Sequence, residues 1–532
     1  MPLWNGWTRR CTILISAGLF LAPAMITVAQ TPNADDLVWQ KSVAKYDHTR
    51  AAILNSVDRQ AEEGPFLLNW DSLKKYKVPD WYQDAKFGIF IHWGVYSVPA
   101  FGDEWYPRKM YIQGSPEFKH QIATYGPETK FGYKDFIPMF HAEHFDPQAW
   151  AALFKESGAK YVIPVAEHHD GFQMYASKLS DWNAAAMGPK RDLVGELADA
   201  VRADGLHFGA SSHRAEHYWF MDSGRAFPSD VQDPKNASLY GPAHVAPQGK
   251  EPGTKGVLHP DAAYLNDWLA RSGELVEKLH PELMYFDWWV EQPEFQPYLR
   301  RFMAFYYNEA AKRGQQPVLF LKNGATPEGT VVLDIERGGL DHVDPLHWQT
   351  DTSVSDKSWG YVKGDTYKSP ESLVWQLIDI VSKNGNLLLN IGPKSDGTIP
   401  DEAVSILQHM GAWLKINGDA IYGTRPWTMY GEGPTKTVAG SFHDTATSPY
   451  QPQDIRFTTK SGDLYAIALG WPTDGKLTVH AVSTGGFRVG EVAMLGSTAK
   501  IRWSQDADGL HLQFPQQHVG MYAYAFRLTP AK

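Results

Sequence analysis

Cysteine is almost absent from this sequence of 532 residues. The single Cys11 lies in the first thirty residues, which have the features of a signal peptide. Arg9 and Arg10 supply a positive start, and the apolar segment 12–22 is too short to span a membrane. Cleavage near residue 30 leaves a mature chain without a thiol, which excludes disulfides, cysteine nucleophiles and thiolate metal sites. We therefore expect a secreted or periplasmic protein.

Excess positive charge and long apolar runs are also missing. The formal net charge is −10, and it becomes −12 once a leader containing Arg9 and Arg10 is removed. A chain of this charge is a poor partner for nucleic acid or for an anionic membrane. After the leader, no segment is apolar for long enough to cross a bilayer. No Gly-x-Gly-x-x-Gly motif follows the first predicted strand, which weakens a dinucleotide-binding interpretation, and we expect no cofactor.

Aromatic residues, in contrast, are abundant. They make up 13% of the chain, with 20 Trp, and hydrophobic residues make up 43%. This composition is not that of a disordered chain. The first interpretation of the aromatic surplus is a large core. The alternative is a sugar-binding surface, because flat rings stack on the apolar faces of pyranoses.

Short apolar runs alternate with helical patterns between about residues 85 and 415. The predicted strands are 86–91, 161–166, 207–210, 283–286, 317–321, 330–335 and 387–391. The predicted helices are 150–157, 193–201, 261–279, 295–313 and 400–416, together with a helix that starts at Ser369, has an apolar stripe over 374–381 and is closed by Gly385. Repeated strand-then-helix units predict a parallel sheet. We favour a closed (β/α)8-like, TIM-type barrel over an open doubly wound sheet.

The pattern changes after about residue 425. Strand-like alternation at 455–459, 464–469 and 521–528 predicts a C-terminal antiparallel β-sandwich. The predicted organisation is a signal peptide at 1–30, an N-terminal extension at 31–75, a catalytic β/α barrel at 76–424 and the β-sandwich domain at 425–532.

Polar side chains follow the ends of five predicted barrel strands, where TIM-type barrels carry their chemistry. These residues are His92; Glu167, His168, His169 and Asp170; Ser211, Ser212 and His213; Asp287, Trp288 and Trp289; and Glu336 with Arg337. Any one of them alone is more simply explained as a structural group, but five ends together predict a pocket. Two carboxylates in such a pocket point to glycoside hydrolysis, with one ionised and one protonated. Their spacing is not readable from sequence, so retention and inversion both stay open.

Several ordered motifs resemble the α-L-fucosidases of glycoside hydrolase family 29, from about Val78 to the C-terminus. They are the segments 81–94, 96–100, 104–106, 168–172, 358–361, 384–393 and 413–418. The resemblance implies a retaining, exo-acting α-L-fucosidase that acts on fucosylated oligosaccharides or glycoconjugates. It also implies that Asp287 is the nucleophile. The acid/base lies on a variable stretch in the family; we assign Glu336, with Glu291 as the alternative.

The resemblance further implies a set of substrate-binding residues. They are His92, Glu104, Trp105, His168 and His169, to which we add His213, Trp289 and Lys322. Three positions depart from the family pattern. Glu167 replaces a common Lys, residues 211–213 replace a Tyr-rich strand end, and Lys322 stands near a usual Arg. We expect His213 or Ser212 to replace a tyrosine contact and Lys322 to supply the charge of the Arg.

Two other functions share part of this pattern. In a metal-dependent hydrolase, His92, His168 and His169 would be ligands, but adjacent residues on an extended strand point to opposite faces, so we expect no metal site. A catalytically inactive fucose-binding protein would lack one carboxylate, and both carboxylates are here. The long loop 223–259 is either a lid or leaving-group subsite, or a surface excursion. Linkage preference, natural glycan and oligomeric state, including a homo-oligomer, stay open.

Overall fold

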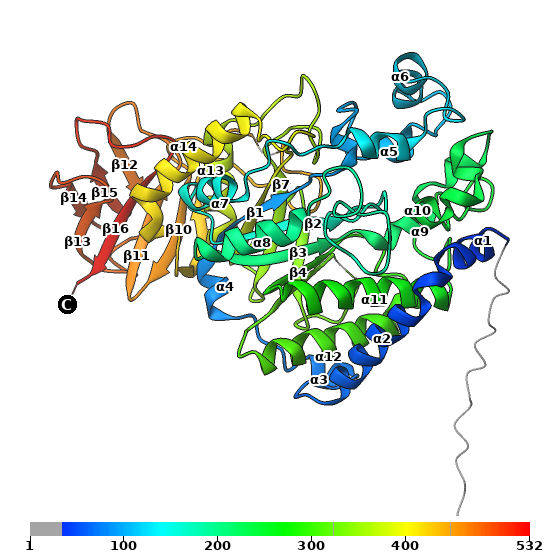
Figure 1. Ribbon diagram of the computed structural model, residues 1–532. Helices are drawn as coiled ribbons and strands as arrows, with labels where there is room; N and C mark the ends of the chain where they lie inside the picture. Colours follow the sequence, from blue (N-terminus) through cyan, green and yellow to red (C-terminus); the bar gives the residue numbers. More distant parts are fainter. Residues whose placement is uncertain (1–33, 323, 447, 532) are drawn as a thin grey trace, which may run out of the picture.

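A computed structural model describes residues 34–322, 324–446 and 448–531. The predicted signal peptide at 1–30 lies outside this range. The described part consists of a central barrel with helices around it and a region of antiparallel sheets at its side (Figure 1). Within these residues, no helix is both long and apolar enough to cross a membrane.

Eight parallel strands close the barrel in the order β1 to β8, and β8 pairs with β1. Their bounds are β1 Phe87–Ile91, β2 Tyr161–Glu167, β3 His207–Ser212, β4 Leu283–Phe286, β5 Val318–Leu321, β6 Val332–Glu336, β7 Trp348–Ser353 and β8 Gly385–Ile391. Closure confirms the predicted barrel class. The strand β7 was not predicted, because its sequence contains no apolar run.

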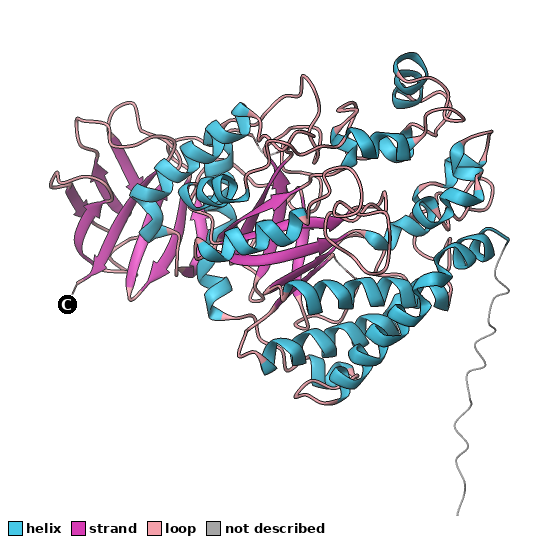
Figure 2. Ribbon diagram, in the orientation of Figure 1, coloured by secondary structure: helices cyan, strands magenta, loops and turns pink. Residues whose placement is uncertain are grey.

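Helices surround the barrel and extend from it (Figure 2). Their bounds are α1 Ala34–Val43, α2 Asp47–Glu62, α3 Trp70–Leu73, α4 Asp80–Ala85, α5 Tyr106–Lys109, α6 Pro116–Thr124, α7 Pro147–Glu156, α8 Leu193–Ala203, α9 His217–Phe220, α10 Ala237–Tyr240, α11 Ala262–Leu279, α12 Gln296–Lys312, α13 Pro370–Ser382 and α14 Asp401–Asn417. The N-terminal extension is helical, and α2 packs against α11 and α12. As predicted, Ser369 caps α13, and its hydroxyl accepts a hydrogen bond from the Ser372 amide.

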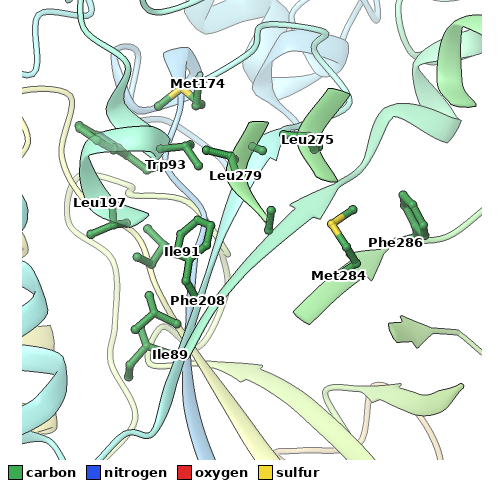
Figure 3. Packing of buried hydrophobic residues seen from close by; sticks show 14 of the residues in the cluster. Ile89, Ile91, Trp93, Met174, Leu197, Phe208, Leu275, Leu279, Met284 and Phe286 are labelled. Atoms are coloured by element: carbon green, nitrogen blue, oxygen red, sulfur yellow. The ribbon is translucent and has the colours of Figure 1, made fainter. Parts of the chain in front are cut away.

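The barrel strands alternate between two buried faces. In β1, Ile89 and Ile91 point outward into the cluster that includes Leu275 and Leu279 of α11 (Figure 3). Phe90, between them, belongs to the separate cluster inside the barrel. A strand has a side-chain period of two, so each strand sends alternate residues to the helices and to the barrel axis. This alternation decides which residues beyond each strand end face the pocket.

The C-terminal region contains two antiparallel sheets around a shared hydrophobic core. Their strands are β9 Arg425–Glu432, β10 Ile455–Lys460, β11 Asp463–Ala468, β12 Lys476–Val479, β13 Val489–Met494, β14 Arg502–Gln505, β15 Leu510–Gln513 and β16 Tyr524–Pro530. The five-stranded sheet has the order β13-β16-β11-β10-β9, and the three-stranded sheet has the order β12-β15-β14. The predicted class, a barrel followed by antiparallel sheets, is confirmed.

Buried polar contacts join the barrel helices to this region. Arg456 of β10 donates to Asp379 of α13 at 2.6 Å, and Trp413 of α14 donates to the Ala523 carbonyl at 2.9 Å. Because Arg456 and Asp379 are buried, these contacts fix how the five-stranded sheet sits on the barrel.

Candidate active site

A pocket of about 370 Å³ opens at the carboxyl ends of the barrel strands. It is lined by Phe90, His92, Asp103, Glu104, Trp105, Lys109, His168, His169, His213, Glu216, Tyr285, Asp287, Trp288, Glu336, Asp351, Trp359 and Phe442. A second cavity of about 520 Å³ lies at the other end of the barrel, beside Tyr76, Gln316 and Asn384. Barrel enzymes carry out chemistry at the carboxyl ends, so the smaller pocket is the candidate active site.

Strand alternation brings the charged groups together. Tyr285 points into the barrel, and Asp287 follows it by two residues. Lys322 likewise follows Phe320, and Glu336 follows Asp334 by the same spacing. All of these side chains therefore project toward the barrel axis from neighbouring strands.

Asp287 lies among basic groups. Its Oδ2 atom is 3.3 Å from Nδ1 of His213 and 3.5 Å from Nε2 of His169. Burial alone would raise the pKa of Asp287, but His213, His169 and the charge of Lys322 hold that pKa well below its usual range. The carboxylate is therefore ionised at neutral pH, as a nucleophile requires.

Glu336 has the opposite protonation behaviour. Its Oε2 atom accepts a hydrogen bond from Nε1 of Trp288 at 2.5 Å and lies 3.4 Å from Nζ of Lys322. Burial raises the pKa of Glu336 to about 7, against the opposing charge of Lys322, with Asp351 and Asp287 adding to the rise. A carboxyl with this pKa can carry a proton in the working pH range, as a general acid must.

Asp351 lines the pocket, although sequence reasoning missed it. It pairs with Glu336 across β6 and β7, and its Oδ2 accepts from the Tyr285 hydroxyl at 2.8 Å. Its Oδ1 atom is buried and has no partner among the described residues. Burial raises the pKa of Asp351 to about 8, and Asp334 adds to that rise. The sequence signal that could have identified Asp351 is an acidic residue at an inward-facing position of the polar strand β7.

Four histidines line one side of the pocket. Nδ1 of His92 lies 2.8 Å from Oδ1 of Asn390, and Nδ1 of His169 lies 2.9 Å from the His213 carbonyl oxygen. The rings of His168 and His169 are 4.4 Å apart between centroids. Burial lowers the pKa of His92, of His168 and of His213, so these three are neutral hydrogen-bonding groups at pH 7.

The expectation that His168 and His169 face opposite directions was wrong. The strand β2 ends at Glu167, and its pairing with β3 is irregular between Val165 and Glu167. A strand irregularity of this kind re-aims side chains. As a result, Glu167 contacts Arg214 and both histidines line the pocket.

These rings also form the groups best placed to hold a metal ion. Ligand atoms lie within 4.8 Å of one another in the group His92, His168 and His213 and in the group His169, His213 and Asp287. Several of these ring nitrogens already have protein partners: Nδ1 of His92 contacts Asn390, and Nε2 of His213 lies 2.8 Å from the Ser211 hydroxyl. The remaining nitrogens suit sugar hydroxyls equally well, so a chelator test belongs with any activity assay.

Glu216 is a second carboxylate that sequence reasoning missed. It follows His213 by three residues, and its Oε2 atom lies 3.5 Å from Nε2 of His169. Burial raises the pKa of Glu216 to about 7, although His169 opposes that rise. In turn, burial would lower the pKa of His169, but Glu216 and Asp287 together raise it. Glu216 and Asp287 thus share one histidine.

Glu104, Trp105 and Trp359 line the pocket wall from loops. Oε2 of Glu104 accepts hydrogen bonds from the Trp359 amide at 2.8 Å and from the Ser358 hydroxyl at 3.1 Å. Burial raises the pKa of Glu104, with a further contribution from Asp103. The expected positions of Glu104 and Trp105 beside the pocket are therefore observed.

Four of the named candidates, Ser212, Trp289, Lys322 and Glu291, do not line the pocket, and His213 takes the position for which Ser212 was the alternative. Trp289 has a left-handed φ of 78°, is 1% exposed and packs against Tyr218, so Trp288 takes the pocket position predicted for Trp289. Lys322 is buried beneath the pocket, where it contacts carboxylates and does not reach the pocket surface. Glu291 also lies outside the lining, which favours Glu336 over Glu291 as the acid.

The loop 223–259 contributes no lining residue to the described pocket. It includes α10, which packs against α1 at the edge of the barrel. Of the two interpretations of this loop, the surface excursion agrees better with this position.

The fold and the pocket define a class of protein. An ionised carboxylate and a protonated carboxyl face one pocket, with aromatic rings and hydroxyl-binding histidines around them. This combination, at the carboxyl ends of a β/α barrel, is that of a glycoside hydrolase.

Comparison with known proteins narrows the class. The profile of the family Alpha-L-fucosidase matches residues 53–419, and that of the Alpha-L-fucosidase C-terminal domain matches 448–529. An alpha-L-fucosidase of Branchiostoma floridae is 34% identical over 85% of this chain and 92% of its own length. Human tissue alpha-L-fucosidase is 31% identical over 90% of this chain and 94% of its own. The chain belongs to the α-L-fucosidase family.

Solved structures agree with this assignment. The α-fucosidase of Thermotoga maritima in complex with a mechanism-based inhibitor has a TM-score of 0.69 to this chain and 31% identity. The similarity covers 87% of this chain and all of the other. The barrel and the C-terminal sheets are thus shared with an enzyme of the same family.

Proposed function

We propose that this chain is a retaining, exo-acting α-L-fucosidase in which Asp287 is the nucleophile and Glu336 the acid/base. The observation that carries the proposal is the contrast between the two carboxyl groups. The pKa of Asp287 lies well below its usual range, whereas the pKa of Glu336 is raised to about 7. Environments that push two carboxyl pKa values apart suit the base and acid roles. Glu216 and Asp351 also have raised pKa values, and Glu336 is chosen over them because the family resemblance places the acid/base after the nucleophile and before Trp348.

In the first step, an Asp287 oxygen attacks the anomeric carbon of the terminal fucose while Glu336 gives its proton to the leaving glycosidic oxygen. A covalent fucosyl-enzyme forms, and the leaving sugar departs as an alcohol. In the second step, Glu336 takes a proton from water, the water oxygen attacks the anomeric carbon, and Asp287 is released. Two inversions at one carbon give net retention.

The surrounding residues fit a single terminal sugar. Phe90 and Tyr285 line the pocket where the barrel interior begins, so the ring enters from the mouth only. The histidines and Glu104 offer hydrogen bonds to hydroxyls, and Trp105 and Trp359 offer apolar faces. The Thermotoga maritima relative has also been solved in complex with fucose. We infer that fucosylated oligosaccharides or glycoconjugates are the substrates.

Asp287→Ala tests the nucleophile. We expect a loss of at least about 10³-fold in kcat on an aryl α-L-fucoside. Azide should restore turnover and yield fucosyl azide of inverted configuration, because azide replaces the missing carboxylate. In the wild type, proton NMR of the first product should show retention. Wild-type turnover by Asp287→Ala, or an inverted first product, would refute the assignment.

A metal-dependent hydrolase is the second candidate, because two groups of ligand atoms are present. Dialysis against a chelator should leave the wild-type activity unchanged if Asp287 and Glu336 carry the reaction. A loss that Zn²⁺ restores would favour the metal.

We further propose export to the periplasm or the medium, on the basis of the leader at 1–30. Cell fractionation followed by N-terminal sequencing tests this. A cytoplasmic protein that keeps Cys11 would contradict it.

A further inference from the structure

We infer that Phe442, which the segment between β9 and β10 holds against the pocket mouth, forms a subsite for the leaving-group sugar. This inference rests on the proposed function, because it requires Glu336 to be the acid. The expected ligand is a pyranose that presents a C–H face to the phenyl ring. This subsite lies on the C-terminal region and not on the loop 223–259.

Phe442 is exposed to solvent and also lines the active-site pocket. Its side chain is 61% exposed. It is the most exposed of the large hydrophobic residues in the described chain. A single exposed hydrophobic residue is common on protein surfaces, but this ring lines a sugar-binding pocket, where its face can stack on a pyranose.

The backbone of Phe442 is held rigidly beside the acid. Its amide donates to the Glu336 carbonyl oxygen at 2.8 Å, and the amides of His443 and Asp444 donate to the Arg337 carbonyl oxygen at 2.7 and 2.8 Å. A bridge between Gly339 and Gly440 extends this contact. The ring is therefore positioned by the same chain segment that carries the acid.

A side-chain anchor completes the attachment. Asp444 accepts a hydrogen bond from the Thr352 hydroxyl at 2.6 Å and lies 3.3 Å from Nζ of Lys368. Phe442 itself has a φ of 62°, a left-handed conformation that is uncommon for a residue with a large side chain. Backbone strain of this kind persists where the surroundings hold it and clusters at ligand sites.

The role of Glu336 as the acid determines on which side of the pocket the leaving-group sugar lies. The acid gives its proton to the glycosidic oxygen, so the leaving sugar must lie next to Glu336 as the bond breaks. Phe442 adjoins Glu336 through the backbone and sits at the mouth, which is the direction in which the leaving group extends. The C–H bonds of a pyranose face carry partial positive charge and match the negative face of the ring.

The test compares substrates that differ only in the leaving group. Methyl α-L-fucoside needs acid assistance, but its leaving group contains no sugar ring. A fucosyl disaccharide needs acid assistance and also has a sugar ring as its leaving group. The disaccharide for the test is chosen by measuring wild-type activity on α1,2-, α1,3-, α1,4- and α1,6-linked compounds and taking the best substrate. In Phe442→Ala we expect kcat/KM to fall about tenfold for the disaccharide and to stay within about twofold for the methyl fucoside. Phe442→Tyr keeps the ring and should retain the wild-type values.

Trp503→Ala is the matched control, because Trp503 is also exposed but lies on β14 and does not line the pocket. It should change neither substrate. An equal fall for both substrates in Phe442→Ala would mean that the residue acts through Glu336, and it would overturn the subsite. Unchanged hydrolysis of both would also overturn it. If the wild type cleaves neither substrate, the proposed function fails and the inference fails with it.

Discussion

Lys322 offers the sharpest test of how the pocket sets the proton affinity of its acid. Its Nζ atom is 2.7 Å from Asp334 and 3.4 Å from both Glu336 and Asp351. The side chain is buried, and although burial would lower the pKa of Lys322, the carboxylates raise it well above its usual range. One cation is thus shared among three acids. The change we consider is Lys322→Met, which keeps much of the volume and removes the charge.

The magnitude follows from these distances. Two unit charges 4 Å apart interact by about 4 kcal/mol at an effective dielectric constant of 20. Asp334 neutralises most of the lysine charge, so we assign roughly a third of this energy, about 1.4 kcal/mol, to Glu336. That energy corresponds to about one pKa unit. Because a positive neighbour favours the carboxylate, its removal should raise the pKa of Glu336, which is about 7 in the wild type.

The assay is the pH dependence of kcat/KM on an aryl α-L-fucoside. Glu336 must be protonated to act as the acid, so wild-type activity should fall as the pH rises through about 7. In Lys322→Met that decline should move about one unit toward higher pH. Lys322→Arg keeps the charge, so its activity should fall over the same pH range as in the wild type. If a folded Lys322→Met variant loses activity over the wild-type pH range, this account of Glu336 is refuted.

Two further changes probe the supports of the site. Glu216→Gln removes a carboxyl group 3.5 Å from His169 whose charge helps to raise the pKa of that ring, so the pKa of His169, followed by NMR titration, should fall. An unchanged His169 titration would show that Glu216 does not act on this ring. Glu167→Gln leaves the buried Arg214 without one partner and should destabilise the fold by about 3 kcal/mol, measured by thermal unfolding. Asp58→Asn, at the more exposed pair with Arg301, is its control and should cost under about 1 kcal/mol. Equal losses in the two variants would contradict the role of burial.

Much of the barrel was readable because most of its strands are apolar on both faces. In β8, Leu387 and Leu389 face the helices while Leu388 faces the barrel axis, so the run is continuously hydrophobic. His92 and Asp287 directly follow such runs. Their place at the pocket could therefore be predicted from the ends of recognisable strands.

The strand β7 could not be predicted, and Asp351 was lost with it. Its inward residues are polar, and their partners come from distant strands. Gln349 accepts from the hydroxyls of Tyr82 and Tyr161 at 2.9 and 3.1 Å, and Asp351 accepts from Tyr285. A buried polar group is stable only when such partners are present. Sequence shows the polar residues but not the tyrosines that satisfy them, so the pattern resembles a loop.

Glu167, one of the departures from the family pattern, illustrates the same limit. Glu167 and Arg214 lie 47 positions apart, and no relation between them is visible in the sequence. In the structure Arg214 donates to Glu167 at 3.0 Å, Arg271 donates to the same oxygen at 3.1 Å, and Asp267 accepts from both arginines. All four side chains are at most 2% exposed. A buried charge is tolerable only with its partner, so an acid at 167 requires a base nearby. The acid at position 167 is therefore compensated by a buried ion-pair network, which joins the ends of β2 and β3 directly behind His168 and His213.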